Sequence, residues 1–315
     1  MPFASIIVPS ASRPQQLGRA LASVRAQTLA DWEVVVVDDG DGEAVDVVRT
    51  LADPRIRALR SPGEGQVDAR NAAIAAASGD LVCWLDDDDW WDDPHHLTLL
   101  RDAAADTCFF YRGGWIVREH DREPFDLVAT CRSLRHNNTI LTSSIGYPRR
   151  LHDELGPLDR DVGSYGDWDW LVRMCDAGLA AHKLPGLGVC YSVHGGNVSS
   201  EYDSPKRRRG FEHFKAKHHL DIEIANHVTI RQMLADVPEG WTVVDDALER
   251  EFELESFPAA IAFVGRVADL AESENHHPDI DIRYRRITLR WTTHSEGGIT
   301  DRDRDMAKRS AELAG

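Results

Sequence analysis

The run EVVVV at residues 33–37 restricts the fold more than any other feature of this sequence. A strand with one solvated face alternates apolar and polar residues, whereas a continuous β-branched run predicts a strand that is covered on both faces. Strand-like and helix-like segments alternate around it, with strands expected at 3–8, 56–59 and 81–85 and helices at 13–27, 43–52 and 66–77. This alternation predicts an α/β fold with a mainly parallel sheet and crossover helices.

Acidic residues stand directly after two of these strands. Asp38 and Asp39 follow EVVVV, and four consecutive aspartates, Asp86 to Asp89, follow LVCWL. Because ligands in such sheets bind at the carboxyl ends of the strands, we expect the acids to converge there. Crowded like charges cost free energy unless a cation or hydrogen-bond donors compensate for them. The aspartates therefore indicate either a divalent cation held by oxygen ligands or a solvated loop that caps a helix.

The composition narrows the classes of partner and compartment. A formal net charge of -17 over 315 residues argues against nucleic acid and anionic membrane, because both need a basic surface. No stretch approaches 18 consecutive apolar residues, so we expect no membrane anchor. The five cysteines are widely spaced and form no CxxC, which favours reduced thiols over a disulfide framework or a zinc site. We therefore expect a cytoplasmic protein.

An ordered set of motifs carries a family resemblance. SIIVPSASRP, AQT, VVVVDDGD, DARNAA and GDLVCWLDDDD follow one another within the first ninety residues. Together they resemble the nucleotide-sugar-binding half of family 2 glycosyltransferases over about residues 3–200. The resemblance implies the GT-A fold, with a Rossmann-like sheet, in a domain at 1–225. It also implies inverting transfer of a sugar from a nucleoside-diphosphate donor to an acceptor hydroxyl, assisted by Mg²⁺ or Mn²⁺.

The same resemblance implies roles for particular residues. Asp88 is the expected metal ligand, and His194 in YSVHGGNVS is expected to be a late second one. The residues implied to bind the nucleotide sugar are Pro9, Asp38, Asp39, Arg70, Asp86 and Asp87. The segment PSASR departs from the family's P-T-Y-N-R, which leaves the preferred nucleotide open.

The segment LGPLDRDVGSYGDWDWLVRM resembles the acceptor region of the same family. Gly166 stands where that family usually has a glutamate, and Asp167 stands at the position of the catalytic base. An inverting transfer needs a carboxylate to take the proton of the acceptor hydroxyl. Asp167 is the expected base and Asp169 the second candidate, while the alternative is that both acids only favour a helix N-terminus. The acceptor itself is unknown.

A different pattern begins near residue 229. Helical spacing of Phe257, Ile261, Val264, Val267 and Ala271 predicts a helix with one buried face, and ITLRW predicts a strand with one covered face. Three histidines, His276, His277 and His294, follow these two elements. Neighbouring side chains diverge and cannot easily ligate one ion, so the histidines favour acid–base chemistry over zinc.

AESENHHP, EGW and THSEGGITDRD resemble the pterin-4a-carbinolamine dehydratases over about residues 231–312. The resemblance implies a small α+β domain at 226–315 that removes the 4a-hydroxyl of a hydroxytetrahydropterin or mediates homo-oligomerisation. It implies that His276, His277 and His294 are catalytic and that Trp241, Glu272 and Asp303 support the pterin pocket. One hypothesis joining the domains is that the acceptor is a pterin. The alternative to both activities is a non-catalytic oligomeric binding protein that retains both folds.

Overall fold

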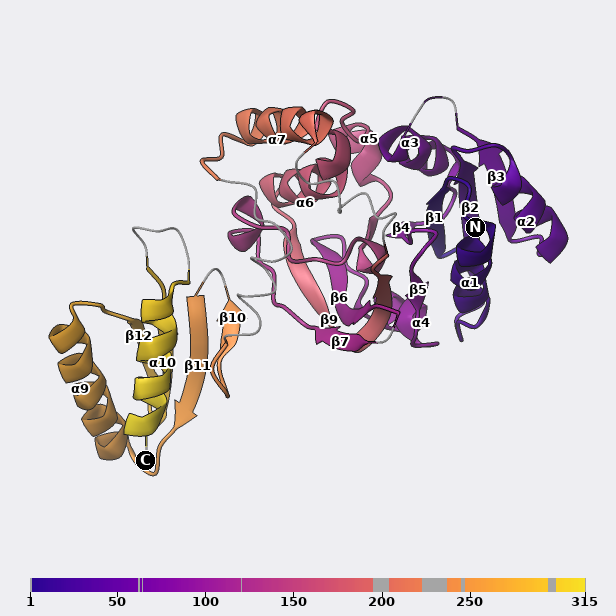
Figure 1. The fold of residues 1–315 in the computed structure, drawn as a ribbon. Coiled ribbons are helices and arrows are strands. Elements are labelled where there is room, and N and C mark those ends of the chain that lie inside the picture. Colours follow the sequence, from indigo (N-terminus) through magenta and orange to yellow (C-terminus); the bar gives the residue numbers. More distant parts are fainter. Residues whose placement is uncertain are drawn as a thin grey trace. The chain divides into compact units, whose positions relative to one another are not determined.

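The computed structural model divides into two compact units, Met1–Ile222 and Glu223–Gly315 (Figure 1). It describes residues 2–61, 63, 65–119, 121–194, 204–222, 237–244, 247–293 and 299–314. No helix within these ranges has the length and apolar character needed to cross a membrane.

The first unit begins with the expected alternation of strands and helices. Its strands β1 to β4 are joined by three crossover helices, and β1 pairs in parallel with both β2 and β4 while β2 pairs in parallel with β3. The elements are β1 (Ala4–Ser10), α1 (Pro14–Arg25), β2 (Trp32–Asp38), α2 (Glu43–Leu51), β3 (Ile56–Arg60), α3 (Gln66–Ala76) and β4 (Leu81–Trp84). The predicted α/β class with a mainly parallel sheet is confirmed for this unit.

The rest of the first unit extends the sheet in the order β3-β2-β1-β4-β8-β6-β9-β5, with β7 paired to β6. The short strand β8 is antiparallel to both of its neighbours. The remaining strands are β5 (Trp90–Trp91), β6 (Cys108–Val117), β7 (Arg122–Phe125), β8 (Gly146–Pro148) and β9 (Ala180–Ser192). The helices are α4 (His96–Ala103), η1 (Ser133–Arg135), η2 (Thr142–Ser144), α5 (Leu151–Leu155), η3 (Gly163–Tyr165), α6 (Gly166–Asp176) and α7 (Pro205–His218).

The strand β2 explains the apolar run from which the fold was predicted. Val34 and Val36 belong to the core on the α1 side of the sheet. Val35 and Val37 belong to the core on the α3 side. All four side chains are fully buried. A polar residue at any of these positions would be buried without a partner, so a strand in this place must be apolar throughout.

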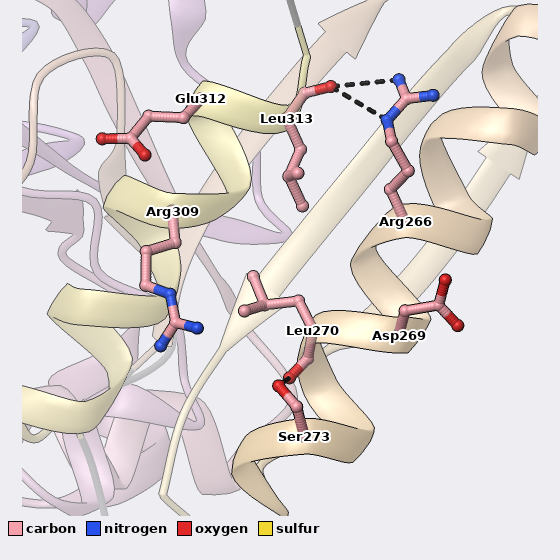
Figure 2. A pocket seen from close by; sticks show the side chains of 7 residues that line it. All are labelled: Arg266, Asp269, Leu270, Ser273, Arg309, Glu312 and Leu313. Atoms are coloured by element: carbon pink, nitrogen blue, oxygen red, sulfur yellow. Dashed lines mark hydrogen bonds between the residues drawn. The ribbon is translucent and has the colours of Figure 1, made fainter.

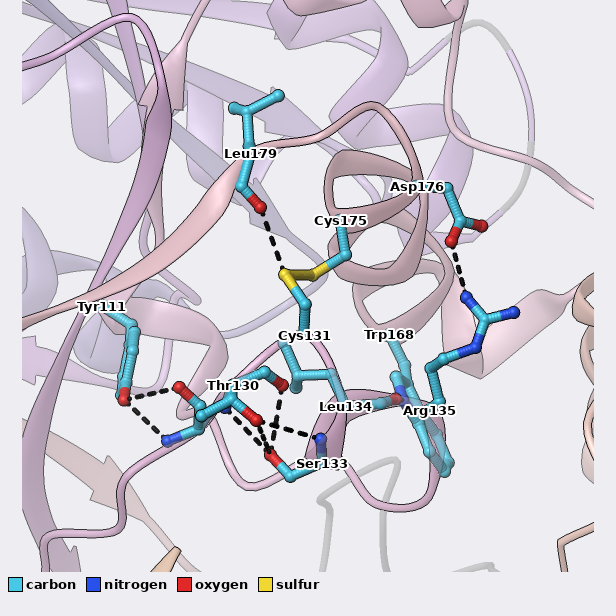
Figure 3. The surroundings of a disulfide bond; sticks show 11 residues. Tyr111, Thr130, Cys131, Ser133, Leu134, Arg135, Trp168, Cys175, Asp176 and Leu179 are labelled. Carbon is cyan, nitrogen blue, oxygen red and sulfur yellow. Dashed lines mark hydrogen bonds and ion pairs between the residues drawn. A yellow bond between two sulfur atoms is a disulfide. The ribbon is translucent and has the colours of Figure 1, made fainter. Parts of the chain in front are cut away.

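One expectation about the cysteines is wrong. Cys131 and Cys175 form a disulfide, with their Cα atoms 5.4 Å apart (Figure 3). The bond ties the loop before η1 to the last turn of α6, two segments separated by 44 residues in the sequence. Only the folding of these segments brings the two thiols together, so spacing alone could not indicate the pair. The other three cysteines, Cys83, Cys108 and Cys190, are free.

Within its described residues, the second unit has a four-stranded antiparallel sheet in the order β10-β11-β13-β12 and two helices. Its elements are β10 (Thr242–Val244), β11 (Ala247–Glu253), α9 (Phe257–Glu274), β12 (Asp279–Arg283), β13 (Arg286–Trp291) and α10 (Asp301–Leu313). This is the small α+β architecture that was predicted. Ser256 caps α9 by accepting from the Ala259 amide, and Thr300 and Asp303 form a capping box at the start of α10.

The predicted buried face of α9 needs correction. The helix buries Ala260, Phe263, Val267 and Ala271 against the sheet. Phe257 and Ile261 are instead exposed, by 45% and 43%. The helix carries two overlapping apolar stripes, and the position of the sheet selects the one that contains Phe263.

Candidate active sites

The aspartates after β4 meet the end of β1, because these two strands are neighbours in the sheet. Ser10, the last residue of β1, donates a hydrogen bond of 2.7 Å to Asp87 Oδ2. Burial raises the pKa of Asp87 to about 6, and the charges of Asp88 and Asp86 act in the same direction against Ser10 and Arg13. The strand ends thus form an acidic centre in which bound cations are electrostatically favoured.

His194 reaches this acidic centre from the end of β9. Its Nε2 atom lies 2.9 Å from Asp88 Oδ2. Two ligands of Mg²⁺ or Mn²⁺ at right angles and about 2.1 Å from the ion would be ~3 Å apart, so this pair fits such an ion. Mg²⁺ commonly takes one or two protein ligands and completes its shell with substrate phosphates and water. The donor set therefore suits a divalent cation that arrives with a diphosphate.

Arg70 and Asp86 form a largely buried ion pair at the same acidic centre. Arg70 lies in α3, is 3% exposed, and donates to Asp86 Oδ1 at 2.5 Å. Its guanidinium also lies over the Trp84 ring, 4.8 Å from the centroid. Burial raises the pKa of Asp86, and the charge of Arg70 opposes this effect. The two predicted residues are thus brought together as a largely buried ion pair.

The two acids after β2 occupy different environments. Asp38 is almost fully buried and accepts from the backbone amides of Gly40 and Val45 at 2.9 and 3.4 Å. Arg60 lies 3.2 Å from the same carboxylate. Asp39 is half-buried and accepts from the Gly65 amide at 2.7 Å. The helix-capping alternative therefore describes Asp38 well, while Asp39 has the more accessible carboxylate.

Asp167 and Asp169 lie in the first turn of α6 and face different surroundings. Asp167 is half-buried and accepts from Thr142 Oγ1 at 2.8 Å and from Asn138 Nδ2 at 3.3 Å. After burial and nearer charges, the charge of its carboxylate is one of the causes that raise the pKa of Asp86, so Asp167 lies within electrostatic reach of the acidic centre. A Cβ atom at Gly166 would approach Val67 Cγ2 to 3.1 Å. A glutamate at this position would therefore crowd α3.

Asp169 has no exposed surface and is surrounded by basic side chains. Its Oδ1 atom lies 2.8 Å from His218 Nε2 and 2.7 Å from Lys217 Nζ, both of α7. Arg173 lies 3.6 Å from the other oxygen. This carboxylate holds α7 against α6 and has no route to an acceptor hydroxyl.

In the second unit, His276 is buried and Asp303 orients it. His276 Nε2 lies 2.7 Å from Asp303 Oδ1, and Thr293 Oγ1 donates to Oδ2 of the same carboxylate at 2.7 Å. Burial acts to raise the pKa of Asp303, but hydrogen bonds from the Thr300 amide, Thr293 and His276 lower it below its usual value. The carboxylate thus holds one imidazole in a fixed orientation.

The remaining predicted residues of this unit are more scattered. His277 is exposed and lies 2.9 Å from Glu272, which is also exposed. Trp241 is buried and packs edge-on against Phe252 in the core. His294 lies outside the described residues. The structure therefore pairs two of the three histidines with acids and places Trp241 in the hydrophobic core.

Comparison with known proteins identifies both units. Two family models match, glycosyl transferase family 2 over residues 5–143 and pterin 4 alpha carbinolamine dehydratase over residues 223–313. Over 95 residues the chain is 50% identical to a putative pterin-4-alpha-carbinolamine dehydratase of Nocardia farcinica, covering 30% of this chain and 99% of that protein. The chain joins a family 2 glycosyltransferase domain to a pterin-4a-carbinolamine dehydratase domain. Two enzyme families thus meet in one chain, as the sequence motifs indicated.

Solved structures agree on the fold of the glycosyltransferase domain. S. aureus TarS residues 1–349 in complex with UDP-GlcNAc matches with a TM-score of 0.56 and 19% identity, over 71% of this chain and 68% of that one. The mannosyltransferase PcManGT of Pyrobaculum calidifontis, in complex with GDP-Man and Mn²⁺, matches with a TM-score of 0.50 and 19% identity, over 86% and 81%. These likenesses confirm the GT-A fold.

Sequence reasoning overlooked two residues of the glycosyltransferase site. Arg13 lies 2.6 Å from Asp88 Oδ2. Asp89 is fully buried, accepts from the Ser192 amide at 2.8 Å and also accepts from Ser143. It thereby joins the ends of β4 and β9 with η2. The fourth aspartate in the DDDD run was the available signal for Asp89, and the arginine that ends PSASR was the signal for Arg13.

Two other features do not coincide with the predicted residues. Asp159, Asp161 and His213 form the one set of three ligand-type side chains in the described ranges whose ligand atoms all lie within 4.8 Å of one another. Lys217 already pairs with Asp159 at 2.7 Å. In the dehydratase domain, a groove of about 510 Å³ runs between α9 and α10, where Arg266 donates to the Leu313 carbonyl (Figure 2). None of the predicted pterin residues lines this groove.

Proposed function

We propose that the glycosyltransferase domain transfers a sugar, with inversion, from a nucleoside-diphosphate donor to an acceptor hydroxyl, and that it requires Mg²⁺ or Mn²⁺. The observation that carries this proposal is the 2.9 Å contact between Asp88 and His194 at the edge of the sheet where the strand ends converge. When bound, the ion offsets the charge that develops on the leaving diphosphate. The Mn²⁺ and GDP-Man named for PcManGT support this interpretation.

The nucleotide sugar would lie along the ends of β1, β2 and β4. Asp39 is the accessible acid for the base or ribose, while Asp38 fixes the start of α2 beneath it. Arg70 would act through Asp86, because its own side chain is buried. The residues proposed to bind the nucleotide sugar or to support its site are Pro9, Asp38, Asp39, Arg70, Asp86 and Asp87.

Asp167 would be the catalytic base. Its carboxylate would take the proton of the acceptor hydroxyl as the oxygen attacks the anomeric carbon. The hydrogen bonds from Thr142 and Asn138 fix the orientation of the carboxylate. Asp169 suits this role less well, because it is fully buried and its carboxylate contacts Lys217 and His218. The described geometry therefore favours one of the two acids.

A thermal-shift panel tests the donor proposal. UDP, GDP and TDP and their sugars would be added with and without Mn²⁺, to the full chain and to Asp88→Asn. Binding at a hundredfold excess over Kd stabilises the native state by about 2.7 kcal/mol. We expect a Mn²⁺-dependent shift with one nucleotide that disappears in Asp88→Asn. Donor hydrolysis with the same dependence would exclude the non-catalytic alternative, and no shift with any nucleotide would contradict the proposal.

For the second domain we propose dehydration of a 4a-hydroxytetrahydropterin, with His276 as the proton-transferring group. The support is the buried His276–Asp303 pair, since a carboxylate that fixes an imidazole makes it a competent acid or base. His277, with Glu272, and His294 would complete the pterin site, and Trp241 would support it from the core. Dehydratase activity that survives in His276→Ala would contradict this role.

Three further points are also proposals. The domain boundary at residues 225 and 226 is supported by the division of the structure after Ile222 and by the dehydratase match from residue 223. Homo-oligomerisation through the dehydratase domain can be measured by light scattering. A pterin acceptor would be refuted if pterins neither bind the chain nor accept sugar.

A further inference from the structure

The proposed metal site already contains a cation, the guanidinium of Arg13. Its Nη1 atom lies 2.6 Å from Asp88 Oδ2 and 3.1 Å from Asp87 Oδ1. Both carboxylates are buried, while the Arg13 side chain is 27% exposed. Arg13 directly precedes α1, whose first residue is Pro14, so the start of a rigid helix fixes the backbone of Arg13. One positive charge thus pairs with two buried carboxylates.

Arg13 and the proposed metal ion would use the same atom. Asp88 Oδ2 is the oxygen that faces His194, at 2.9 Å, and it is also the oxygen that accepts from Arg13. A divalent ion bound between Asp88 and His194 would stand next to the guanidinium, and the two positive charges would repel each other at this distance. The ion and Arg13 therefore compete for Asp88.

We propose that Arg13 is a built-in counterion, which a divalent cation displaces from Asp88 and which then binds the donor diphosphate. This inference rests on the proposed metal site. A guanidinium released from one anion binds phosphate oxygens well, often through two parallel hydrogen bonds. A bare metal ion that takes Asp88 from Arg13 leaves it paired with Asp87 and brings no new anion, whereas the metal–diphosphate complex offers Arg13 phosphate oxygens as well. Arg13 thus makes the site selective for the complex over the bare ion.

Arg19 supplies the matched control. It carries the same charge in the same neighbourhood, but it donates to the backbone carbonyl of Asp88, at 2.6 Å. Its guanidinium also stacks on the Trp90 ring, 3.7 Å from the centroid. Arg19 therefore contacts no oxygen that a metal ion would need. Replacing Arg19 changes the local charge but removes no partner of the Asp88 carboxylate.

The test measures Mn²⁺ binding to the full chain by electron paramagnetic resonance, first without and then with inorganic pyrophosphate. In Arg13→Gln we expect the Kd of bare Mn²⁺ to fall about tenfold, equivalent to about 1.4 kcal/mol, and in Arg19→Gln less than about threefold. The Kd of pyrophosphate in the presence of Mn²⁺ should change in the opposite direction in Arg13→Gln, with a rise of about tenfold. Asp88→Asn should abolish Mn²⁺ binding.

The decisive result is that Arg13→Gln lowers the Kd of bare Mn²⁺ and raises the Kd of pyrophosphate. An unchanged Mn²⁺ Kd in Arg13→Gln, with binding still lost in Asp88→Asn, would overturn the role of Arg13 and leave the metal site intact. Equal gains in Arg13→Gln and Arg19→Gln would overturn it too, because bulk charge would then explain both. Absence of Mn²⁺ binding in every form of the chain would overturn the metal site as well. If Arg13→Gln does not fold, Arg13→Lys should give an intermediate Kd, and a wild-type value would refute the proposal.

Discussion

Separate replacement of Asp167 and Asp169 should show that the first acid is needed for the transfer rate and the second for stability. The two acids lie two positions apart in α6, yet only Asp169 is buried among charged partners. Asp169→Asn removes the carboxylate that Lys217, His218 and Arg173 share, while His218 keeps Asp176 at 3.8 Å. Breaking a buried ion pair costs about 3–5 kcal/mol. Because Lys217 keeps a second partner in Asp159, at 2.7 Å, we expect the free energy of unfolding to fall by the lower end of this range, about 3 kcal/mol.

Asp167→Asn should behave in the opposite way. The amide oxygen of an asparagine can still accept from Thr142, so the loss of stability should stay within about 1 kcal/mol. The amide cannot take a proton from a hydroxyl, so transfer should slow by about 10² to 10⁴-fold. Asp169→Asn, assayed well below its melting transition, should retain a rate within several-fold of the wild-type enzyme.

Thermal unfolding followed by tryptophan fluorescence measures the stability effects. For a unit of this size each kcal/mol shifts Tm by roughly 2–4 °C, so Asp169→Asn should melt about 6–12 °C lower. Asp167→Asn should melt within about 4 °C of the wild-type enzyme. Sugar transfer to the acceptor, or donor hydrolysis in its absence, measures the rate. Full turnover in Asp167→Asn, or a stable but inactive Asp169→Asn, would refute the assignment of the base.

Three other perturbations test separate parts of the structure. Asp89→Ala removes the carboxylate that accepts hydrogen bonds from Ser192 and Ser143, so His194, which follows Ser192, should be displaced. The affinity for Mn²⁺, measured by titration, should therefore fall, and an unchanged affinity would contradict this role of Asp89. Burial lowers the pKa of His152 from 6.5 to about 4, so the unfolded chain binds the proton more tightly between these values. Up to about 3 kcal/mol of stability should therefore be lost as the pH falls from 6.5 to 4. In His152→Phe, the free energy of unfolding measured with urea should depend less steeply on pH over this range. Reduction of the disulfide, which spans 44 residues, should cost up to about 4 kcal/mol, and an identical Tm with and without dithiothreitol would argue that the bond is absent.

The parts of the fold that follow from local periodicity were predictable. The run EVVVV could only be a strand covered on both faces, and the rule for parallel sheets then placed the acids of β2 and β4 at one edge. The strand β8 was not predictable. It has three residues, and its place between β4 and β6 is determined by tertiary contacts rather than by its own pattern. Its neighbour Ser143, which anchors Asp89, was missed for the same reason.

The candidate site was predictable as a set of residues but not as a set of roles. Asp38 and Asp39 are equivalent in the sequence, and only the position of α2 shows that Asp38 caps the helix while Asp39 stays accessible. Asp167 and Asp169 are equally suited to a helix N-terminus, and only the docking of α7 assigns a cation to Asp169. Periodicity identifies which face of a helix is apolar, whereas the partner of a polar residue depends on a distant segment.

The four aspartates after β4 illustrate the same point at the centre of the site. Asp86 is tied to a buried arginine, and Asp89 is tied to the ends of other elements, so neither can change partners without loosening the sheet edge. Asp88 alone contacts both an imidazole and a side chain with substantial exposure, Arg13. A binding site needs a ligand whose present partner can be exchanged for another. By this criterion Asp88 is the aspartate best suited to hold an exchangeable cation, and the neighbouring carboxylates hold it in place.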